Sequence, residues 1–123
     1  METNEVTGEI VRGAMRVHSA LGPGLLESVY RICLCHELTK RGLQAVPERP
    51  VEIRYDGIVI KTVLRIDIVV EGKVVVELKS VEKMKELYIS QLFSYMNLSG
   101  IRTGLLINFN VRHLRNGIRR FVR

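Results

Sequence analysis

The chain has 123 residues, 46% of them hydrophobic, and no repeat or low-complexity tract, so we expect one globular domain over residues 1–123. No stretch approaches the roughly 18 apolar residues of a membrane span, and the first residues lack the features of a signal peptide, so we expect a soluble cytoplasmic protein. The formal net charge of +6 is confined to residues 102–123, which contain six arginines and no acid, whereas residues 1–101 hold 13 basic and 13 acidic groups.

A basic terminal segment on a neutral body indicates a surface that contacts phosphates, which makes nucleic acid the partner favoured by charge. Four arginines are the candidates for that contact: Arg112, Arg115, Arg119 and Arg120. A solubilising face without a partner explains the charge about equally well, because few aromatic residues lie among the arginines.

The first predicted helix begins after Thr7, its expected N-cap, because apolar residues then recur at helical spacing as far as Leu21. His18 lies on the apolar face of this helix. A core histidine with one hydrogen bond is the favoured interpretation, and a metal-ligand role is the alternative. A Gly-Pro-Gly sequence over residues 22–24 then ends the helix.

The second predicted helix runs from about residue 25 to residue 41 and is apolar around most of its circumference. At about 100° per residue, Glu27 falls between Leu34 and Leu38 in angle, which places a carboxylate on a core-facing stripe. The alternative is a first-turn glutamate that is favoured by the helix dipole and paired with Arg31.

A β region is expected next, with Pro47 and Pro50 bracketing its start. Alternating apolar residues predict strands over 51–55 and 58–70, joined by an Asp-Gly hairpin. Asp67 is an acid within the otherwise apolar second half of the longer strand. It is therefore a candidate functional residue.

The stretch KVVVELKS, residues 73–80, predicts a third, buried strand. Strand periodicity places Glu77 and Lys79 on the same face, near the end of that strand. A two-residue loop before the strand would set Asp67 and Glu77 on opposite faces, whereas a three-residue loop or a β-bulge would set them directly opposite each other. A shared acidic site therefore predicts the longer or bulged turn.

A third helix is expected over 83–98, with Gln91 and Tyr95 as a polar spot on the stripe that faces the sheet. A core tyrosine beside a boundary glutamine is the alternative. Two further strands are predicted over 103–109 and 118–122. The resulting order, ααβββαββ, predicts an α/β protein in which helices flank a mixed sheet.

The acidic residues predict a metal site when they are considered together. Two or three carboxylates converging from Glu27, Asp67 and Glu77 would form a hard oxygen site for Mg²⁺ or Mn²⁺. A lysine beside such a site, here Lys79, can orient or help deprotonate a water and offset charge on the phosphate under attack.

The spacing D-(x)9-E-x-K, formed by Asp67, Glu77 and Lys79, resembles the signature of the PD-(D/E)XK nuclease superfamily. The pair Gln91-xxx-Tyr95 is similar to the QxxxY element of the RecB-like branch of that superfamily. The resemblance implies a restriction-endonuclease-like fold, with a mixed β-sheet flanked by helices.

A narrower resemblance comes from the second helix. Gly24, Glu27 and Tyr30 match the GxxExxY motif, after which a small bacterial family of this superfamily is named, and the similarity extends from about Thr7 to the C-terminus.

The resemblance implies a divalent-metal-dependent nuclease that uses Mg²⁺ or Mn²⁺ to hydrolyse phosphodiester bonds of DNA. It assigns roles to the acids Glu27, Asp67 and Glu77, the catalytic Lys79, the supporting Gln91 and Tyr95, and His18 as a further metal-ligand candidate. Two alternatives stay open: an inactive nucleic-acid-binding or regulatory module, and a structural network in which Glu77 and Lys79 pair with Arg65 or Arg31. So small a domain has little room for substrate selection, so we also expect a homodimer or a partner protein.

Overall fold

The computed structural model of the chain describes residues 1–61 and 64–123. In chain order the elements are α1 (Thr3–Leu21), α2 (Glu27–Lys40), β1 (Ala45–Tyr55), β2 (Ile58–Val70), β3 (Val74–Lys79), α3 (Glu86–Ser99), β4 (Thr103–Asn108), η1 (Leu114–Gly117) and β5 (Ile118–Val122). The predicted order ααβββαββ is confirmed, with one short 3₁₀ helix, η1, before the last strand. None of the helices in the described ranges is long and apolar enough to cross a bilayer.

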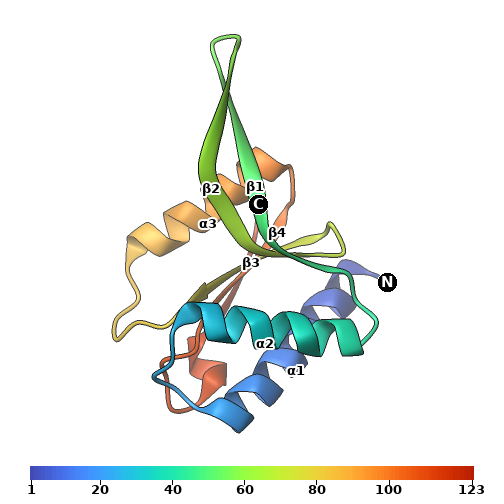
Figure 1. Cartoon of the computed structure of the whole chain (residues 1–123), viewed down its shortest axis with the longest axis vertical. Helices are drawn as coiled ribbons and strands as arrows, with labels where there is room; N and C mark the ends of the chain where they lie inside the picture. Colours follow the sequence, from blue (N-terminus) through green and yellow to red (C-terminus); the bar gives the residue numbers. More distant parts are fainter.

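The described strands form one mixed sheet in the order β1-β2-β3-β4-β5. Strands β3 and β4 are parallel, and the other neighbours are antiparallel. A parallel pair needs a crossover connection, and α3 provides it. Figure 1 shows α1 and α2 on one side of the sheet and α3 on the other, which is the three-layer arrangement expected for the fold class.

Residues of β3 contribute alternately to the two cores. Val74, Val76 and Leu78 pack beneath α1 and α2, whereas Val75 packs beneath α3. Because side chains alternate along a strand, Glu77 projects toward the α3 side, like Val75. The face of the sheet that carries Glu77 is therefore the face covered by α3.

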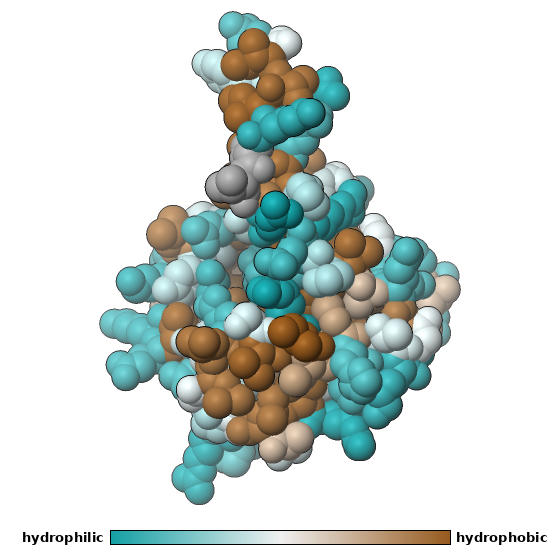
Figure 2. Space-filling view, in the orientation of Figure 1, coloured by the Kyte–Doolittle hydropathy of each residue, from teal (hydrophilic) through white to brown (hydrophobic). Residues whose placement is uncertain are grey.

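Strands β1 and β2 continue beyond the body of the molecule as a long hairpin (Figures 1 and 2). β1 begins at Ala45, earlier than predicted, and contains both Pro47 and Pro50. The prolines are compatible with β1 because it is an edge strand, whose outer side needs no backbone donor. The ladder to β2 is irregular between Pro50 and Glu52.

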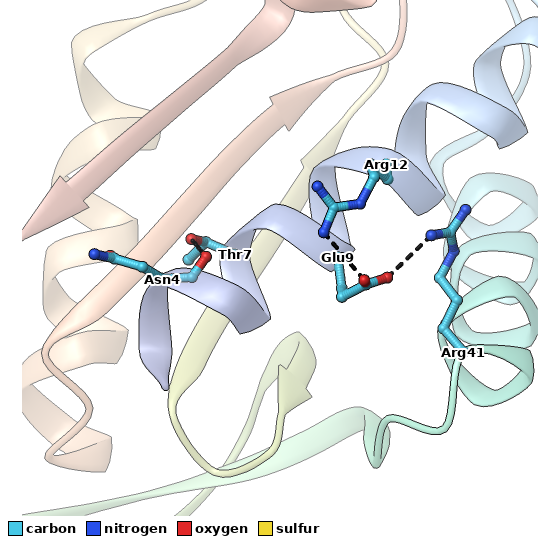
Figure 3. Close-up of polar contacts among 5 residues, drawn as sticks. All are labelled: Asn4, Thr7, Glu9, Arg12 and Arg41. Atoms are coloured by element: carbon cyan, nitrogen blue, oxygen red, sulfur yellow. Dashed lines mark hydrogen bonds and ion pairs between the residues drawn. The ribbon is translucent and has the colours of Figure 1, made fainter. Parts of the chain in front are cut away.

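Helix α1 begins at Thr3, so the expectation that Thr7 caps its N-terminus was wrong. The carboxylate of Glu5 accepts the backbone N–H of Glu2 (3.2 Å), which satisfies one of the free donors at the true start. The Thr7 hydroxyl instead donates back to the carbonyl of Asn4 (3.0 Å; Figure 3). A hydroxyl residue one turn inside a helix thus gave a false start signal.

Glu9 joins the two N-terminal helices. Its carboxylate accepts hydrogen bonds from Arg12 on α1 and from Arg41, directly after α2, both at 3.0 Å (Figure 3). Hydrogen bonds from Arg41 and Arg12 hold the pKa of Glu9 below its usual value. The α1/α2 layer is thereby held together at its polar edge as well as by its core.

Helix α3 begins at Glu86 and packs through Leu92 and Met96. These side chains fill the space above Gly104, where an added Cβ would lie 2.7 Å from the Met96 sulfur. The packing stripe is therefore rotated from the one expected through Gln91 and Tyr95, and Gln91 is exposed. A glycine in the facing strand decides which helix residues approach most closely.

Helix α2 is covered on one face only. Tyr30, Leu34 and Leu38 are fully buried, whereas Leu26, just before the helix, and Ile32 are 75% and 67% exposed. Figure 2 shows apolar residues gathered over the two N-terminal helices. The prediction that α2 is apolar around most of its circumference holds for its composition, but part of that circumference faces solvent.

Candidate active site

The turn between β2 and β3 decides whether the acids meet. Val70 pairs with Val74, so the loop has three residues, Glu71 to Lys73. The Lys73 N–H donates to the Val70 carbonyl (3.0 Å), and both Glu71 and Gly72 have positive φ. The longer turn that a shared acidic site requires is confirmed.

Asp67 and Glu77 lie opposite each other, one step beyond the last paired residues of β2 and β3, Ile68 and Val76. The Asp67 N–H donates to Oε1 of Glu77 (3.2 Å), and the Leu78 N–H donates to Oδ2 of Asp67 (2.7 Å). Each carboxylate thus satisfies a backbone donor of the other strand. At this end of the hairpin, carboxylates replace the backbone ladder, and the two acids are held together.

Burial makes this pair electrostatically unusual. Glu77 is only 7% exposed. Burial first, and then the charge of Asp67, raise the pKa of Glu77 to about 9, although Lys79 acts in the opposite direction. At neutral pH Glu77 therefore keeps its proton.

The structural alternative predicted a salt-bridge network around Glu77 and Lys79. Arg31 instead pairs with Glu48 (3.7 Å). Within residues 1–61 and 64–123, neither Glu77 nor Lys79 forms an ion pair with any residue. An internal ion-pair network is therefore not what holds these groups in place.

Helix α3 lines the same face as the acids. Nζ of Lys79 lies 4.4 Å from the centre of the Tyr88 ring. Burial and the charges of Glu77 and Asp67 raise the pKa of Tyr95, which shows that this phenol lies close to the acid pair. Exposed Gln91 lies between the two tyrosines on this helix face. Tyr88 is a neighbour of Lys79 that the sequence motifs do not include.

Glu27 is exposed, so its predicted place on a core-facing stripe was wrong. It is the first residue of α2, and Leu26 beside it is exposed as well, because this end of the helix is not covered by the core. The Ser80 N–H donates to Oε1 of Glu27 (3.4 Å), which places the carboxylate just after the end of β3. No ion pair joins Glu27 to Arg31 in the described part of the chain.

The segment before Glu27 is fixed at several points. The Ser80 hydroxyl donates to the carbonyl of Leu25 (2.5 Å). The Tyr30 hydroxyl accepts the Leu25 N–H (3.1 Å) and donates to the carbonyl of Gly22 (2.6 Å), while its ring stacks on Phe109 (4.3 Å between centroids). Tyr30 therefore holds the 22–26 loop, a role that its sequence motif does not reveal.

His18 makes the single hydrogen bond expected of a core histidine. It is 9% exposed, and its Nε2 lies 2.8 Å from the carbonyl oxygen of Val111. Because a carbonyl can only accept, Nε2 carries the proton. Among the described contacts, none joins His18 to Asp67, Glu77 or Glu27.

Asn108 is a buried polar residue that sequence analysis missed. It ends β4 directly beside Lys79 and is 3% exposed. Its Nδ2 donates to the Val81 carbonyl (3.0 Å), and its Oδ1 accepts the N–H groups of Val81 and Asn110, both at 3.1 Å. Asn108 therefore holds the segment that follows Lys79. A polar residue ending a fully buried strand was the available signal.

The four candidate arginines do not form one surface. Arg112 and Arg115 flank the start of η1. Arg119 lies over the ring of Phe121 (5.0 Å), which packs on the α3 side, whereas Arg120 donates to Asn4 of α1 (2.6 Å) on the other side. Neighbouring strand residues point to opposite faces, so Arg119 and Arg120 are separated by the sheet.

In the described ranges no three His, Cys, Asp or Glu side chains converge as a preformed metal site. The donors that do converge are the carboxylates of Asp67 and Glu77. Hard oxygen donors of this kind suit Mg²⁺ or Mn²⁺, and Mg²⁺ is usually held by one or two carboxylates while it keeps several waters. The chemistry of the acid pair therefore fits such an ion.

Comparisons with known proteins agree with this arrangement. A family model described as the PD-(D/E)XK nuclease superfamily matches residues 4–121, which is nearly the whole chain. Neither the curated proteins nor the solved structures gave a match. The match covers all but the first residue of α1 and the last residue of β5 and includes the acid pair, so the chain belongs to the PD-(D/E)XK nuclease superfamily.

Proposed function

We propose that this protein is a divalent-metal-dependent nuclease that hydrolyses phosphodiester bonds of DNA. The observation that carries the proposal is the meeting of Asp67 and Glu77 at the end of β2 and β3, with Lys79 two residues further along the same face. Superfamily membership supports the reaction class, and the basic C-terminal segment supports a nucleic-acid substrate. A cytoplasmic location stays a prediction.

Asp67 and Glu77 would hold the ion, and Glu27 lies beyond the end of β3, within the same region. A bound Mg²⁺ or Mn²⁺ would supply Lewis acidity toward the phosphate and acidify a water. The Glu77 carboxyl must lose its proton before it can serve as a charged ligand. His18, which bonds to Val111, is not assigned to the metal.

Lys79 is the proposed catalytic cation. Its ammonium group can orient the attacking water and offset charge that develops on the phosphate. The Tyr88 ring beneath Nζ restricts where that ammonium can lie. Gln91 and Tyr95, on the same helix face, would position the substrate or the acid pair.

We further propose membership in the GxxExxY family. The Tyr30 hydroxyl bonds to the loop that contains Gly24 and directly precedes Glu27, so the three motif residues belong to one structural unit. Gly24 has a φ of 97°, a conformation that L side chains rarely adopt. Both observations support a motif in which the glycine shapes the loop, the tyrosine holds it, and the glutamate faces the site.

The alternative function is an inactive nucleic-acid-binding or regulatory module. It is favoured by one observation, that no third carboxylate converges with Asp67 and Glu77 in the described part of the chain. Titration calorimetry with Mn²⁺ separates the two functions. Binding that is lost in Asp67→Asn supports the nuclease, and no binding at millimolar Mn²⁺ supports the inactive module.

The direct test is cleavage of linear, branched and single-stranded DNA, and of RNA, with Mg²⁺ or Mn²⁺. We expect the wild-type protein to cleave DNA and the Lys79→Ala variant not to cleave it. Lys83 is an exposed lysine just after the strand, and Lys83→Ala should cleave at the wild-type rate. Cleavage that persists undiminished in Lys79→Ala would contradict the assignment and point to a contaminant or to another site.

Association with a second copy or a partner protein stays a prediction. The exposed apolar residues near the start of α2, Leu26 and Ile32, support it, because apolar patches of this kind often mark interaction surfaces. Light scattering on the purified protein tests the homodimer. A monomer at every concentration would leave only the partner protein.

A further inference from the structure

A pocket lies between the end of α1, the 22–26 loop and η1. It has a volume of about 650 Å³, and its walls include Arg112, His113 and Arg115 around η1, His18 of α1, and Gly22 and Pro23 of the loop. Figure 1 shows η1 beside the end of α1 and the start of that loop. Segments nearly 100 residues apart in sequence therefore form one site.

This pocket contains positive charge without a counter-charge. None of its lining residues is an acid. Arg12 and Arg41 both pair with Glu9, and Arg16 pairs with Glu37. In the described ranges, by contrast, Arg112 and Arg115 have no ion pair, and every acid of the chain precedes residue 102. A pair of arginines left without carboxylates is the arrangement that an anionic ligand needs.

His18 adds a directed polar atom to the pocket wall. Its Nε2 proton is used by the carbonyl of Val111. Nδ1 has no hydrogen bond within the described residues, yet no buried side-chain nitrogen or oxygen there lacks a partner, so Nδ1 must reach solvent. Since His18 lines this pocket, Nδ1 faces it, and a protonated ring would donate to an anion.

The loop connects this pocket to the acid pair. Pro23 lines the pocket, whereas Glu27, four residues later, accepts the Ser80 N–H at the end of β3. Four residues span at most about 14 Å. Pro23 of the pocket wall and Glu27 beside the end of β3 therefore lie no further apart than this. The Tyr30 hydroxyl bonds to Gly22 and Leu25, on the two sides of Pro23, and holds the shape of this loop.

We propose that Arg112, Arg115 and His18 form a phosphate subsite for the nucleic-acid strand whose bond is positioned at Glu77 and Lys79. The inference rests on the proposed nuclease function. The ligand is a phosphate oxygen group, either an internal diester or a terminal 5′-monoester. The guanidinium groups bind it through paired N–H donors, and His18 adds a donor at Nδ1 when its ring is protonated.

The test measures binding of a fluorescent single-stranded DNA 12-mer in EDTA, which prevents cleavage. We expect Arg112→Ala/Arg115→Ala to weaken binding at least tenfold and to reduce the slope of log K against log salt by about 1.4. The charge-matched control is Arg54→Ala/Lys61→Ala on the β1–β2 hairpin, which removes two exposed cations and should weaken binding less than threefold.

Oligonucleotides with a 5′-phosphate or a 5′-hydroxyl distinguish a terminal 5′-monoester from an internal diester as the ligand. A preference for the 5′-phosphate that disappears in Arg112→Ala/Arg115→Ala identifies the terminal monoester, and tight binding without that preference identifies an internal diester. Equal losses in the two double variants, or no binding by the wild-type protein, would overturn the subsite. Selective loss of binding in the arginine variant, with no cleavage by the wild-type protein in Mn²⁺, would uphold the subsite and contradict the nuclease.

Discussion

The acid pair and the arginine pocket carry opposite charges, and in both the charged groups lack an ion-pair partner within residues 1–61 and 64–123. At the end of β2 and β3, Asp67 and Glu77 lie together without an ion-pair partner among the described residues. Beside η1, Arg112 and Arg115 line one pocket, again without one. Glu9, by contrast, pairs with two arginines (Figure 3). Charges of one sign that are gathered in one place without a counter-charge allow an external ion to complete the site.

The difference between the two regions lies in burial. Glu77 is 7% exposed, and its backbone donors and neighbours determine its geometry before any ligand binds. The two arginines are exposed and free to adapt. A buried, preorganised acid pair suits catalysis, which needs accurate positioning, whereas flexible cations suit a backbone contact that tolerates variation in sequence.

The largest effect is expected from breaking the acid pair. Asp67→Asn replaces a carboxylate ligand with a neutral amide, so metal binding should fail and cleavage should fall about 10³-fold. DNA binding in EDTA should stay within about threefold of wild type, since the arginine pocket is untouched. Parallel cleavage and anisotropy measurements check this. A matching loss of DNA binding would show that the two regions are not separable.

The next effect concerns stability and its pH dependence. The pKa of Glu77 is about 9 in the folded chain, above the value of 4.5 for a free glutamate, so the folded state binds more protons between these values. In EDTA, the free energy of unfolding should therefore fall as pH rises from about 5 to about 9. Glu77→Gln should flatten this dependence and stabilise the protein by about 2 kcal/mol near pH 9.

Urea unfolding at a series of pH values measures this directly. Glu52→Gln, an exposed glutamate of β1, is the matched control and should follow the wild-type curve. A wild-type stability that rises between pH 6 and pH 9 would contradict the raised pKa. A stabilised but inactive Glu77→Gln protein would show that the buried acid is kept for function at a cost in stability.

The acid pair could be predicted from sequence because it depends on local rules. Strand alternation placed Glu77 and Lys79 on one face, and the count of loop residues decided whether Asp67 would join them. The element order followed from periodicity and turn residues in the same way. These features depend on residues that are close in sequence, so a single sequence is sufficient to predict them.

The remaining parts of the site depend on packing between distant segments. Glu27 was expected in the core because helical periodicity gives an angle but not the edge at which the covering sheet ends. Asn108 and Tyr30 act through backbone groups of distant segments, so the partners of these two side chains do not follow from the sequence. The arginines of the C-terminal segment looked like one patch, although Arg119 and Arg120 lie on opposite faces of β5.

The loop between the two regions gives a smaller effect. Tyr30→Phe removes the hydroxyl that bonds to Gly22 and Leu25, which should cost about 1–2 kcal/mol of stability. Cleavage should fall about tenfold, because Glu27 and the pocket would no longer keep a fixed spacing. Tyr55→Phe, on a side chain that is 70% exposed, is the control and should change neither value. Unchanged cleavage in Tyr30→Phe would mean that the loop does not couple the regions.

The smallest effect is expected from Tyr88, whose ring contacts Lys79, the cation beside the acid pair. Its ammonium group lies over the Tyr88 ring rather than beside a carboxylate, a contact worth about 0.5–1 kcal/mol. Tyr88→Leu should therefore reduce cleavage by only about three- to fivefold. Tyr88→Phe keeps the ring face and should match the wild-type rate, whereas equal losses in both variants would assign the effect to the hydroxyl. The Tyr88 ring holds the Lys79 ammonium without neutralising its charge. The ammonium therefore stays available to the phosphate, and the carboxylates stay available to the metal.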